Sequence, residues 1–180
     1  MSFRPLYDKT IPEFFIGVDL GQAQDYTAIS VIEGGQDYRV RHLVRERGIP
    51  YPDVVDQIHS IMHSRELEES RAKLVVDQTG VGAPVVDLMR KSGQNPIAIT
   101  ITAGDKAHAE EGRRRNWRVP KRDLISNLLV LSQNGRLKIA AGLKEAPTLA
   151  AELQDFRVKL TLRLPTTAIL LGKGNTTISS

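Results

Sequence analysis

Two aspartates in the sequence follow short apolar runs and stand close to glycines. Asp19 ends the segment FFIGVD, and Gly21 follows two positions later. Asp77 ends the segment KLVVD and precedes Gly80 and Gly82. Apolar runs of this length that end at a turn are typical of buried β-strands. Because ligand sites of open α/β sheets lie at the carboxyl ends of strands, both carboxylates are candidates for chemistry.

Each aspartate alone also has a purely structural interpretation. The sequence Asp-x-Gly at Asp19 is a common turn, and Asp77 stands where it could form a turn or cap the following helix. The pair makes a stronger case, because two uncompensated carboxylates at one edge of a sheet repel each other and usually bind a cation. Carboxylate oxygens are hard ligands, so the pair predicts Mg²⁺ or Mn²⁺. Asp25 lies in the turn that follows Asp19.

A basic segment, GRRRNWRVPKR, covers residues 112–122 and contains six basic residues and no acid. A basic run in isolation is most often a solvated loop, but such runs also mark contacts with nucleic acid. The nucleic-acid interpretation gains weight beside a metal site that could promote attack on a phosphate. Trp117, the sole tryptophan, could stack on a base or fill the core. The residues predicted to bind DNA are Arg113, Arg114, Arg115, Arg118, Lys121 and Arg122.

Composition excludes several other kinds of chemistry. The 180 residues include no cysteine, which excludes a cysteine nucleophile, a thiolate metal site and a disulfide scaffold. No apolar run approaches the ~20 residues of a membrane-spanning helix, and the first residues lack a signal-peptide pattern. We therefore expect a cytoplasmic protein without membrane contact. His59 and His63 are four positions apart, but Ser60 stands where a zinc protease motif requires glutamate.

Hydrophobic patterning predicts the elements that position these residues. Helical spacing predicts helices that begin at Pro52 and Pro120, and another over residues 83–92. Hairpins join the first three predicted strands and helices join the later ones, so we predict an α/β fold with a mixed five-stranded sheet and helices on both faces. The first and fourth strands are then central neighbours. The predicted strands cover residues 14–18, 26–33, 37–44, 72–77 and 95–101.

With these residues in view, the sequence resembles the C-terminal nuclease domain of phage terminase large subunits, which has an RNase H-like fold. The similar stretch runs from about Phe14 to Leu160. In that family the nuclease follows an ATPase that drives DNA into the capsid, and it cuts concatemeric viral DNA with an acidic cluster and two divalent metals. The most specific blocks are FFIGVDLGQAQDYTAISVIE, LVVDQTGVGAPVVDLM and VPKRDLISNLLVLSQNGRLKIA.

The resemblance implies a role for each acidic residue. Asp19 matches the acid of the first strand and Asp77 the acid of the fourth, so both are implied to be catalytic and to bind Mg or Mn in a two-metal site. Asp25 matches a recurring acid of the same turn and is implied to be catalytic as well. The implied protein is a metal-dependent endonuclease of a phage or prophage, in the cytoplasm of a bacterial host. Its implied partners are double-stranded DNA, the terminase ATPase domain, the small terminase subunit and the portal.

The sequence departs from that family in two respects. The ATPase half is absent, and so is the third acid, which belongs to a His-Asp-Asp-Leu motif near the C-terminus of the family. We expect a lead-in at residues 1–13, the nuclease domain at residues 14–160 and an atypical tail without acidic residues at 161–180. Codons compatible with Leu171–Ser180 permit WEGEHDDLV when read one nucleotide earlier, so a frameshift after Leu160 would explain the tail. Without the third acid we expect impaired metal binding and impaired cleavage. The alternative function is a non-catalytic DNA-binding remnant of a terminase.

Overall fold

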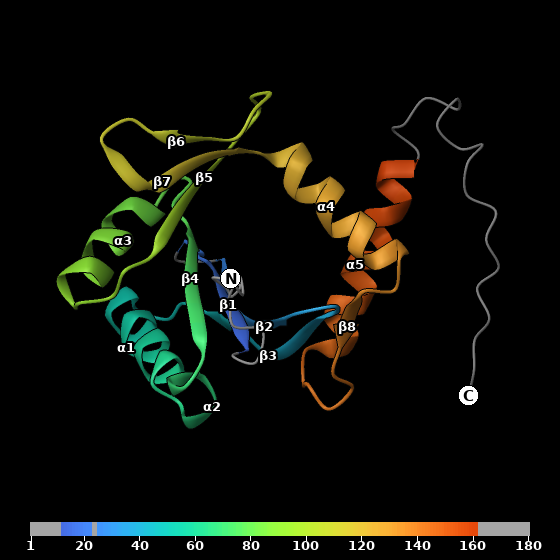
Figure 1. Cartoon of the computed structure of the whole chain (residues 1–180), viewed down its shortest axis with the longest axis horizontal. Coiled ribbons are helices and arrows are strands. Elements are labelled where there is room, and N and C mark those ends of the chain that lie inside the picture. The colour runs from blue at the N-terminus through green and yellow to red at the C-terminus, as the bar shows by residue number, and fades with distance from the viewer. Residues whose placement is uncertain (1–11, 23–24, 162–180) are drawn as a thin grey trace, which may run out of the picture. The chain divides into compact units, whose positions relative to one another are not determined.

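An eight-stranded mixed sheet organises the computed structural model, which describes residues 12–22 and 25–161 (Figure 1). The strand order is β6-β7-β5-β4-β1-β2-β3-β8. The strands are β1 (Glu13–Asp19), β2 (Tyr26–Gly34), β3 (Tyr38–Arg47), β4 (Arg71–Asp77), β5 (Ile97–Thr102), β6 (His108–Glu110), β7 (Arg113–Pro120) and β8 (Leu137–Ile139). The helices are α1 (Tyr51–Met62), α2 (Arg65–Glu68), α3 (Gly82–Lys91), α4 (Lys121–Gln133) and α5 (Ala146–Thr161).

The connections follow the predicted plan. β1, β2 and β3 form an antiparallel meander, whereas β4 pairs in parallel with β1 and β5 in parallel with β4. The α/β class and the mixed sheet are therefore confirmed, and β1 and β4 are central neighbours as the predicted order required. A division between two compact units falls after Ala146, so α5 belongs almost entirely to the second unit.

The predicted strand count of five is wrong, because the residues that the structure describes form a sheet of eight strands. Most of the predicted basic segment is strand β7, which pairs in parallel with β5 and antiparallel with β6. The sequence of β7 does not show the alternation of polar and apolar residues that is typical of a strand. Arginines occupy exposed positions on both faces of β7, and its buried positions are Asn116 and Pro120. The short strand β8 adds to the opposite edge through β3.

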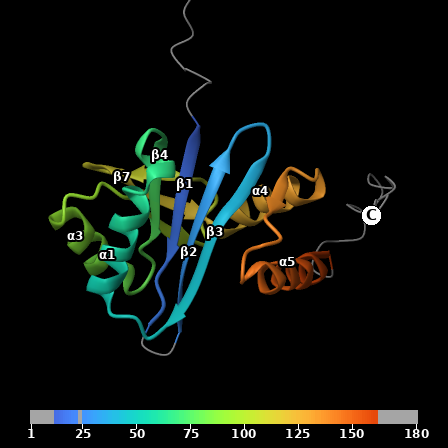
Figure 2. The same ribbon diagram turned by 90° about the horizontal axis from the view of Figure 1, so that it is seen from below.

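One face of the sheet carries the hydrophobic core. Alternate residues of β1, Phe14, Ile16 and Val18, are buried, and Leu74 and Val76 of β4 continue this face. The apolar sides of α1 and α3 cover it, and these two helices lie side by side on the sheet (Figures 1 and 2). The apolar residues that α1 and α3 contribute to this core are Val54, Val55, Ile58, Val85, Val86 and Met89.

The opposite face, here called the acidic face, contains the intervening residues of the same strands. On β1 these are Phe15, Gly17 and Asp19. Lys73 of β4 forms an ion pair with Glu13 and lies over the Phe15 ring. α4 begins directly after β7 and none of its residues is buried, and α5 belongs to the second unit, so helical covering of the acidic face stays a prediction.

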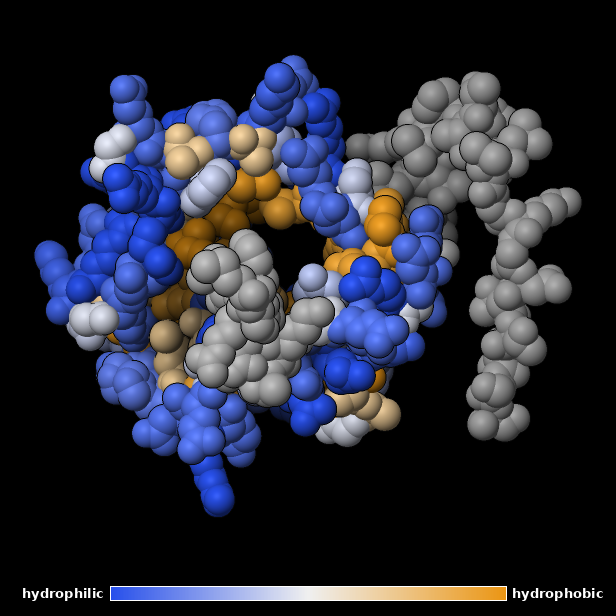
Figure 3. All heavy atoms as spheres, viewed as in Figure 1, coloured by the Kyte–Doolittle hydropathy of each residue, from blue (hydrophilic) through white to orange (hydrophobic). Residues whose placement is uncertain are grey.

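Figure 3 shows hydrophilic residues around the outside of the molecule and apolar residues nearer the centre of the view, around the position of β5. Among residues 12–22 and 25–161, no helix combines the length and the apolar character that crossing a bilayer demands.

The turn from β4 into α3 depends on a residue without a side chain. A Cβ atom at Gly82 would lie 2.4 Å from the Asp77 carbonyl oxygen. We predict that Gly82→Ala lowers the free energy of unfolding by up to about 2 kcal/mol, because a backbone clash costs about 1–3 kcal/mol and the helix-propensity gain returns about 1 kcal/mol. Chemical denaturation measures this. Gly142→Ala is the control, because nothing lies within 4 Å of its added Cβ, and an equal effect of both substitutions would contradict the prediction.

Candidate metal site and nucleic-acid interface

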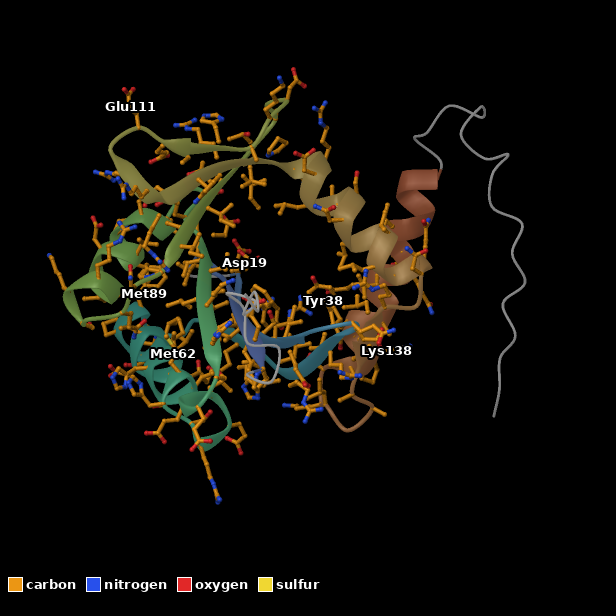
Figure 4. The ribbon with its side chains drawn as sticks, in the orientation of Figure 1. Asp19, Tyr38, Met62, Met89, Glu111 and Lys138 are labelled. Atoms are coloured by element: carbon orange, nitrogen blue, oxygen red, sulfur yellow. The ribbon has the colours of Figure 1, made fainter. Side chains whose placement is uncertain are left out.

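The register between β1 and β4 brings Asp19 and Asp77 together. Val18 lies opposite Val76 in the parallel pair, so the next residue on each strand is an aspartate. Both valines point into the core, and both aspartates therefore point to the acidic face. Asp19 lies on the side of the sheet away from Met62 and Met89 of the two helices (Figure 4). The two carboxylates thus share one edge and one face.

The chain around Asp19 is held by contacts of the following loop. The Gly21 N–H donates to Thr27 Oγ1 at 3.1 Å, and the Tyr51 hydroxyl donates to the Gly21 carbonyl at 3.3 Å. A Cβ atom at Gly21 would lie 2.6 Å from the Tyr26 carbonyl carbon, so the loop passes too close for any other residue without a shift. These contacts keep the end of β1 next to the start of β2.

Asp77 is held by its own turn. The Thr79 N–H donates to Asp77 Oδ1 at 2.8 Å, and Thr79 Oγ1 accepts from the Ile101 N–H at 2.8 Å. The residue at the N-cap of α3 is Val81, without a side-chain hydrogen bond, so Asp77 does not cap that helix. The turn-forming interpretation therefore holds for Asp77, while Oδ2 makes no hydrogen bond with a described residue.

Burial raises the pKa of the Asp19 carboxyl above its ordinary value of 3.8, and the charge of Asp77 raises the pKa further. Although Asp19 as a whole is solvent-exposed, the protein around its carboxylate removes enough water to disfavour the charged form. Asp19 makes no ion pair with a described residue. The edge therefore holds negative charge that its own protein surroundings do not compensate.

The third predicted acid does not complete a cluster in the described structure. Asp25 is exposed, and its N–H donates to the Gln22 carbonyl at 2.6 Å in the turn before β2. Among residues 12–22 and 25–161, no group of three or more Asp, Glu or His side chains could hold a metal ion. The catalytic role of Asp25 stays a prediction. The tail at 162–180, including the region of the proposed frameshift, lies outside the described residues.

The six predicted DNA-binding residues differ in their contacts. Arg115 donates to the carbonyls of Asn95 and Pro96 at 2.7 and 3.4 Å. Arg118 pairs with Glu110 at 3.6 Å, and Arg122 pairs with Asp105 at 2.9 Å. In the part of the chain that the structure describes, the other three make no side-chain hydrogen bond or ion pair and are therefore available to a polyanion. These are Arg113, Arg114 and Lys121.

Trp117 does not fill the core. It is 39% exposed, and it lies on β7 between buried Asn116 and exposed Arg118. Asn116 faces the helix-covered side, where Arg90 of α3 donates to its Oδ1 at 2.6 Å. Because neighbouring strand residues point to opposite faces, Trp117 belongs to the acidic face.

Sequence reasoning missed one group of residues on that face. The guanidinium groups of Arg45 and Arg47 lie 4.2 and 4.4 Å from the centre of the Tyr26 ring. The two arginines are two positions apart on a strand and therefore share a side, a pattern that could have identified them. A separate cavity of about 620 Å³ contacts β3, α1 and α2 and contains none of the predicted site residues.

The raised pKa of Asp19 predicts a pH-dependent stability. A carboxyl with a higher pKa in the folded state contributes stability at low pH that is lost as the pH rises through that value. We predict that, without divalent cations, Asp19→Asn resists denaturant better than the unsubstituted chain at pH 7, with a difference that disappears toward pH 3. Unfolding curves across this range measure it.

The matched control is Asp56→Asn, which removes an exposed carboxylate from α1 and should change stability by less than about 0.5 kcal/mol. If Asp19→Asn instead lowered stability at pH 7, the carboxylate of Asp19 would be a stabilising group and the inferred repulsion would be wrong.

Comparison with known proteins adds independent information. A family model described as "Terminase RNaseH-like domain" matches residues 16–168, a match that ends beyond Leu160. No curated protein matches the chain significantly.

Two solved structures show the same fold. The large terminase nuclease of thermophilic phage G20c has a TM-score of 0.50 and 22% identity over 73% of this chain and 60% of that chain. The human cytomegalovirus terminase nuclease domain, soaked with Mn and bound to an inhibitor, has a TM-score of 0.52 and 11% identity over 81% of this chain and 75% of that chain. The chain thus spans less than two thirds of the phage structure. Because the family match covers most of the residues, the chain belongs to the terminase RNaseH-like domain family.

Proposed function

We propose that the chain is the metal-dependent DNA endonuclease domain of a phage or prophage terminase and cleaves concatemeric viral DNA during packaging in the bacterial cytoplasm. The observation that carries the proposal is the uncompensated pair Asp19 and Asp77 on one face of the central strands. Family membership supports it. A terminase ATPase domain, a small terminase subunit and a portal are the proposed protein partners.

The acidic pair fits a divalent cation. Two carboxylates offer hard oxygen ligands, and their mutual repulsion is relieved when a cation lies between them. Asp19 and Asp77 would hold Mg²⁺ or Mn²⁺, and the Thr79 N–H would keep the Asp77 carboxylate oriented. A bound cation would supply Lewis-acid activation of a water and stabilise the leaving oxygen of a phosphodiester. The Mn soak of the cytomegalovirus domain makes Mn²⁺ a natural probe.

Arg113 and Arg114 at the start of β7 and Lys121 at the start of α4 would bind the DNA backbone. Arg113, Arg114 and Lys121 carry charge that no described acid neutralises. Since phosphate contacts position a protein on DNA without reading sequence, these residues would orient the duplex and would contribute little to sequence preference.

A non-catalytic DNA-binding remnant is the second candidate. Its support is the lack of a third metal-binding side chain beside Asp19 and Asp77 among the described residues. A nicking assay distinguishes the two candidates when the chain is compared with a form whose codons after Leu160 are read in the alternative frame. Cleavage by neither form, with DNA binding by both, would favour the remnant.

The endonuclease proposal predicts loss of cleavage without loss of binding. In a supercoiled-plasmid assay with Mn²⁺, Asp19→Asn and Asp77→Asn should each reduce nicking at least about tenfold to a hundredfold, because loss of a direct ligand is no milder than loss of its outer-sphere support. Their DNA affinity in EDTA should not fall, since each substitution removes a negative charge.

Asp56→Asn serves as the control for loss of a carboxylate and should nick like the unsubstituted chain. Undiminished nicking by both Asp19→Asn and Asp77→Asn would show that other residues carry the reaction.

The difference in contacts among the six basic residues of β7 and α4 yields a further prediction. Replacing Arg113, Arg114 and Lys121 together by alanine should weaken duplex binding at least about tenfold. It should also lower the slope of log affinity against log salt by roughly one unit per lost phosphate contact. Fluorescence anisotropy of a labelled duplex at several salt concentrations measures both.

Arg115→Ala is the contrasting variant, because the guanidinium of Arg115 donates hydrogen bonds to the Asn95 and Pro96 carbonyls. It should lower stability by about 1 kcal/mol while it changes the salt slope less. An unchanged affinity in the triple variant would mean that these cations are only solvated.

A further inference from the structure

Tyr26, Arg45 and Arg47 form a compact cationic cluster, here called the Tyr26 cluster. Tyr26 begins β2 and is 40% exposed. Both arginines lie at the C-terminal end of β3, and their guanidinium groups lie within 4.4 Å of the same ring centre. An aromatic ring holds a guanidinium plane by cation–π and stacking interactions while the N–H groups at its edge stay able to donate. The ring therefore orients two guanidinium groups.

The cluster lies on the same face as the acidic pair. Asp19 pairs with Ala28 on β2, and Ala28 pairs with Arg45 on β3. Tyr26 and Arg47 are paired one step further along, two residues away on each strand, and so have the same orientation. Arg45 thus stands in the transverse row that contains Asp19.

The same row continues on the other side of the acids. Asp77 pairs with Ile99 on β5, and Ile99 pairs with Trp117 on β7. Neighbouring strands are about 4.8 Å apart, so Arg45 stands about 10 Å from Asp19 on one flank, and Trp117 about 10 Å from Asp77 on the other. The acidic pair therefore lies midway between two exposed groups that suit nucleic acid.

The charge pattern of β3 singles out this cluster. Arg39 and Arg41, nearer the start of the strand, pair with Asp37 and Glu33 at 3.7 Å. Arg47 makes no ion pair with a described acid, and its guanidinium and that of Arg45 both lie against the Tyr26 ring. Two cations gathered in this way repel each other, and a bound phosphate relieves that repulsion.

We propose, on the basis of the endonuclease function above, that the Tyr26 cluster binds backbone phosphates of the DNA on the side of the acidic pair opposite β7. The duplex then crosses the strands of the sheet, with the scissile phosphate over Asp19 and Asp77. A distance of about 10 Å corresponds to the axial rise of about three phosphates of one strand. The cluster accordingly contacts the backbone about three nucleotides from the cut.

The test measures binding of an uncleaved duplex of about 30 base pairs to the full chain in EDTA. Label anisotropy reports affinity, and quenching of Trp117, the sole tryptophan, reports occupancy of the far flank. Arg45→Ala combined with Arg47→Ala should weaken binding at least about tenfold and shift the midpoints of the anisotropy and quenching titrations equally. It should lower the slope of log affinity against log salt by roughly two. Tyr26→Leu should weaken binding less, because it removes the ring and keeps both charges.

Arg39→Ala combined with Arg41→Ala is the matched control, because it removes the same charge from the same strand. It should change affinity by less than about threefold. Far-ultraviolet circular dichroism and thermal unfolding verify that each variant is folded.

Three outcomes overturn the proposal. If the Arg45/Arg47 variant binds with unchanged midpoint and slope while the unsubstituted chain binds and nicks DNA, only the Tyr26 cluster assignment fails. Equal losses in the variant and its control would reduce the effect to net charge, which contradicts a defined site. If the unsubstituted chain binds no duplex at any salt concentration, the cluster assignment fails together with the proposed function.

Discussion

The parallel pairing of β1 with β4 is the constraint on which the rest of this structure depends. It joins residues that are 58 positions apart in the chain, and its register sets Val18 against Val76. Because side chains alternate along a strand, that one register sends the valines into the core and the aspartates to the opposite face. A shift of one residue in either strand would bury one carboxylate among apolar side chains. The hydrophobic core on one face thus determines where negative charge appears on the other.

In this arrangement the core stabilises the fold, and the acidic pair of the candidate site destabilises it. Apolar burial beneath α1 and α3 favours the fold. By contrast, burial of the Asp19 carboxyl and, after it, the charge of Asp77 raise the pKa of Asp19, so the ionised pair costs free energy when no cation is present. Close backbone packing at Gly21 and Gly82 holds both acids in place despite their repulsion. A site that is held rigid and left electrostatically unsatisfied is a general property of binding sites for ions, because the protein forgoes stability that the ligand restores.

Positive charge is distributed around the acids in a way that net charge does not reveal. The chain carries a formal charge of only +4. On β3 the cations near the start of the strand pair with acids, and those near its end stack on Tyr26. On β7 some arginines support the fold and others remain available. The proposed DNA path follows the Tyr26 cluster on one flank and the basic residues of β7 on the other, and it passes over the acids between them.

The sequence by itself determined the features that depend on local patterning. Asp19 and Asp77 could be identified because each ends a short apolar run, and the helix after Pro120 could be predicted from its starting proline. Tertiary structure decided the features that depend on pairing between distant strands. β7 was not predicted because its partner β5, and not its own composition, supplies the hydrogen bonds that make it a strand. Likewise, only the register across six strands places Arg45, the two aspartates and Trp117 in one row, since no local pattern in the sequence encodes which residues of separate strands lie opposite one another.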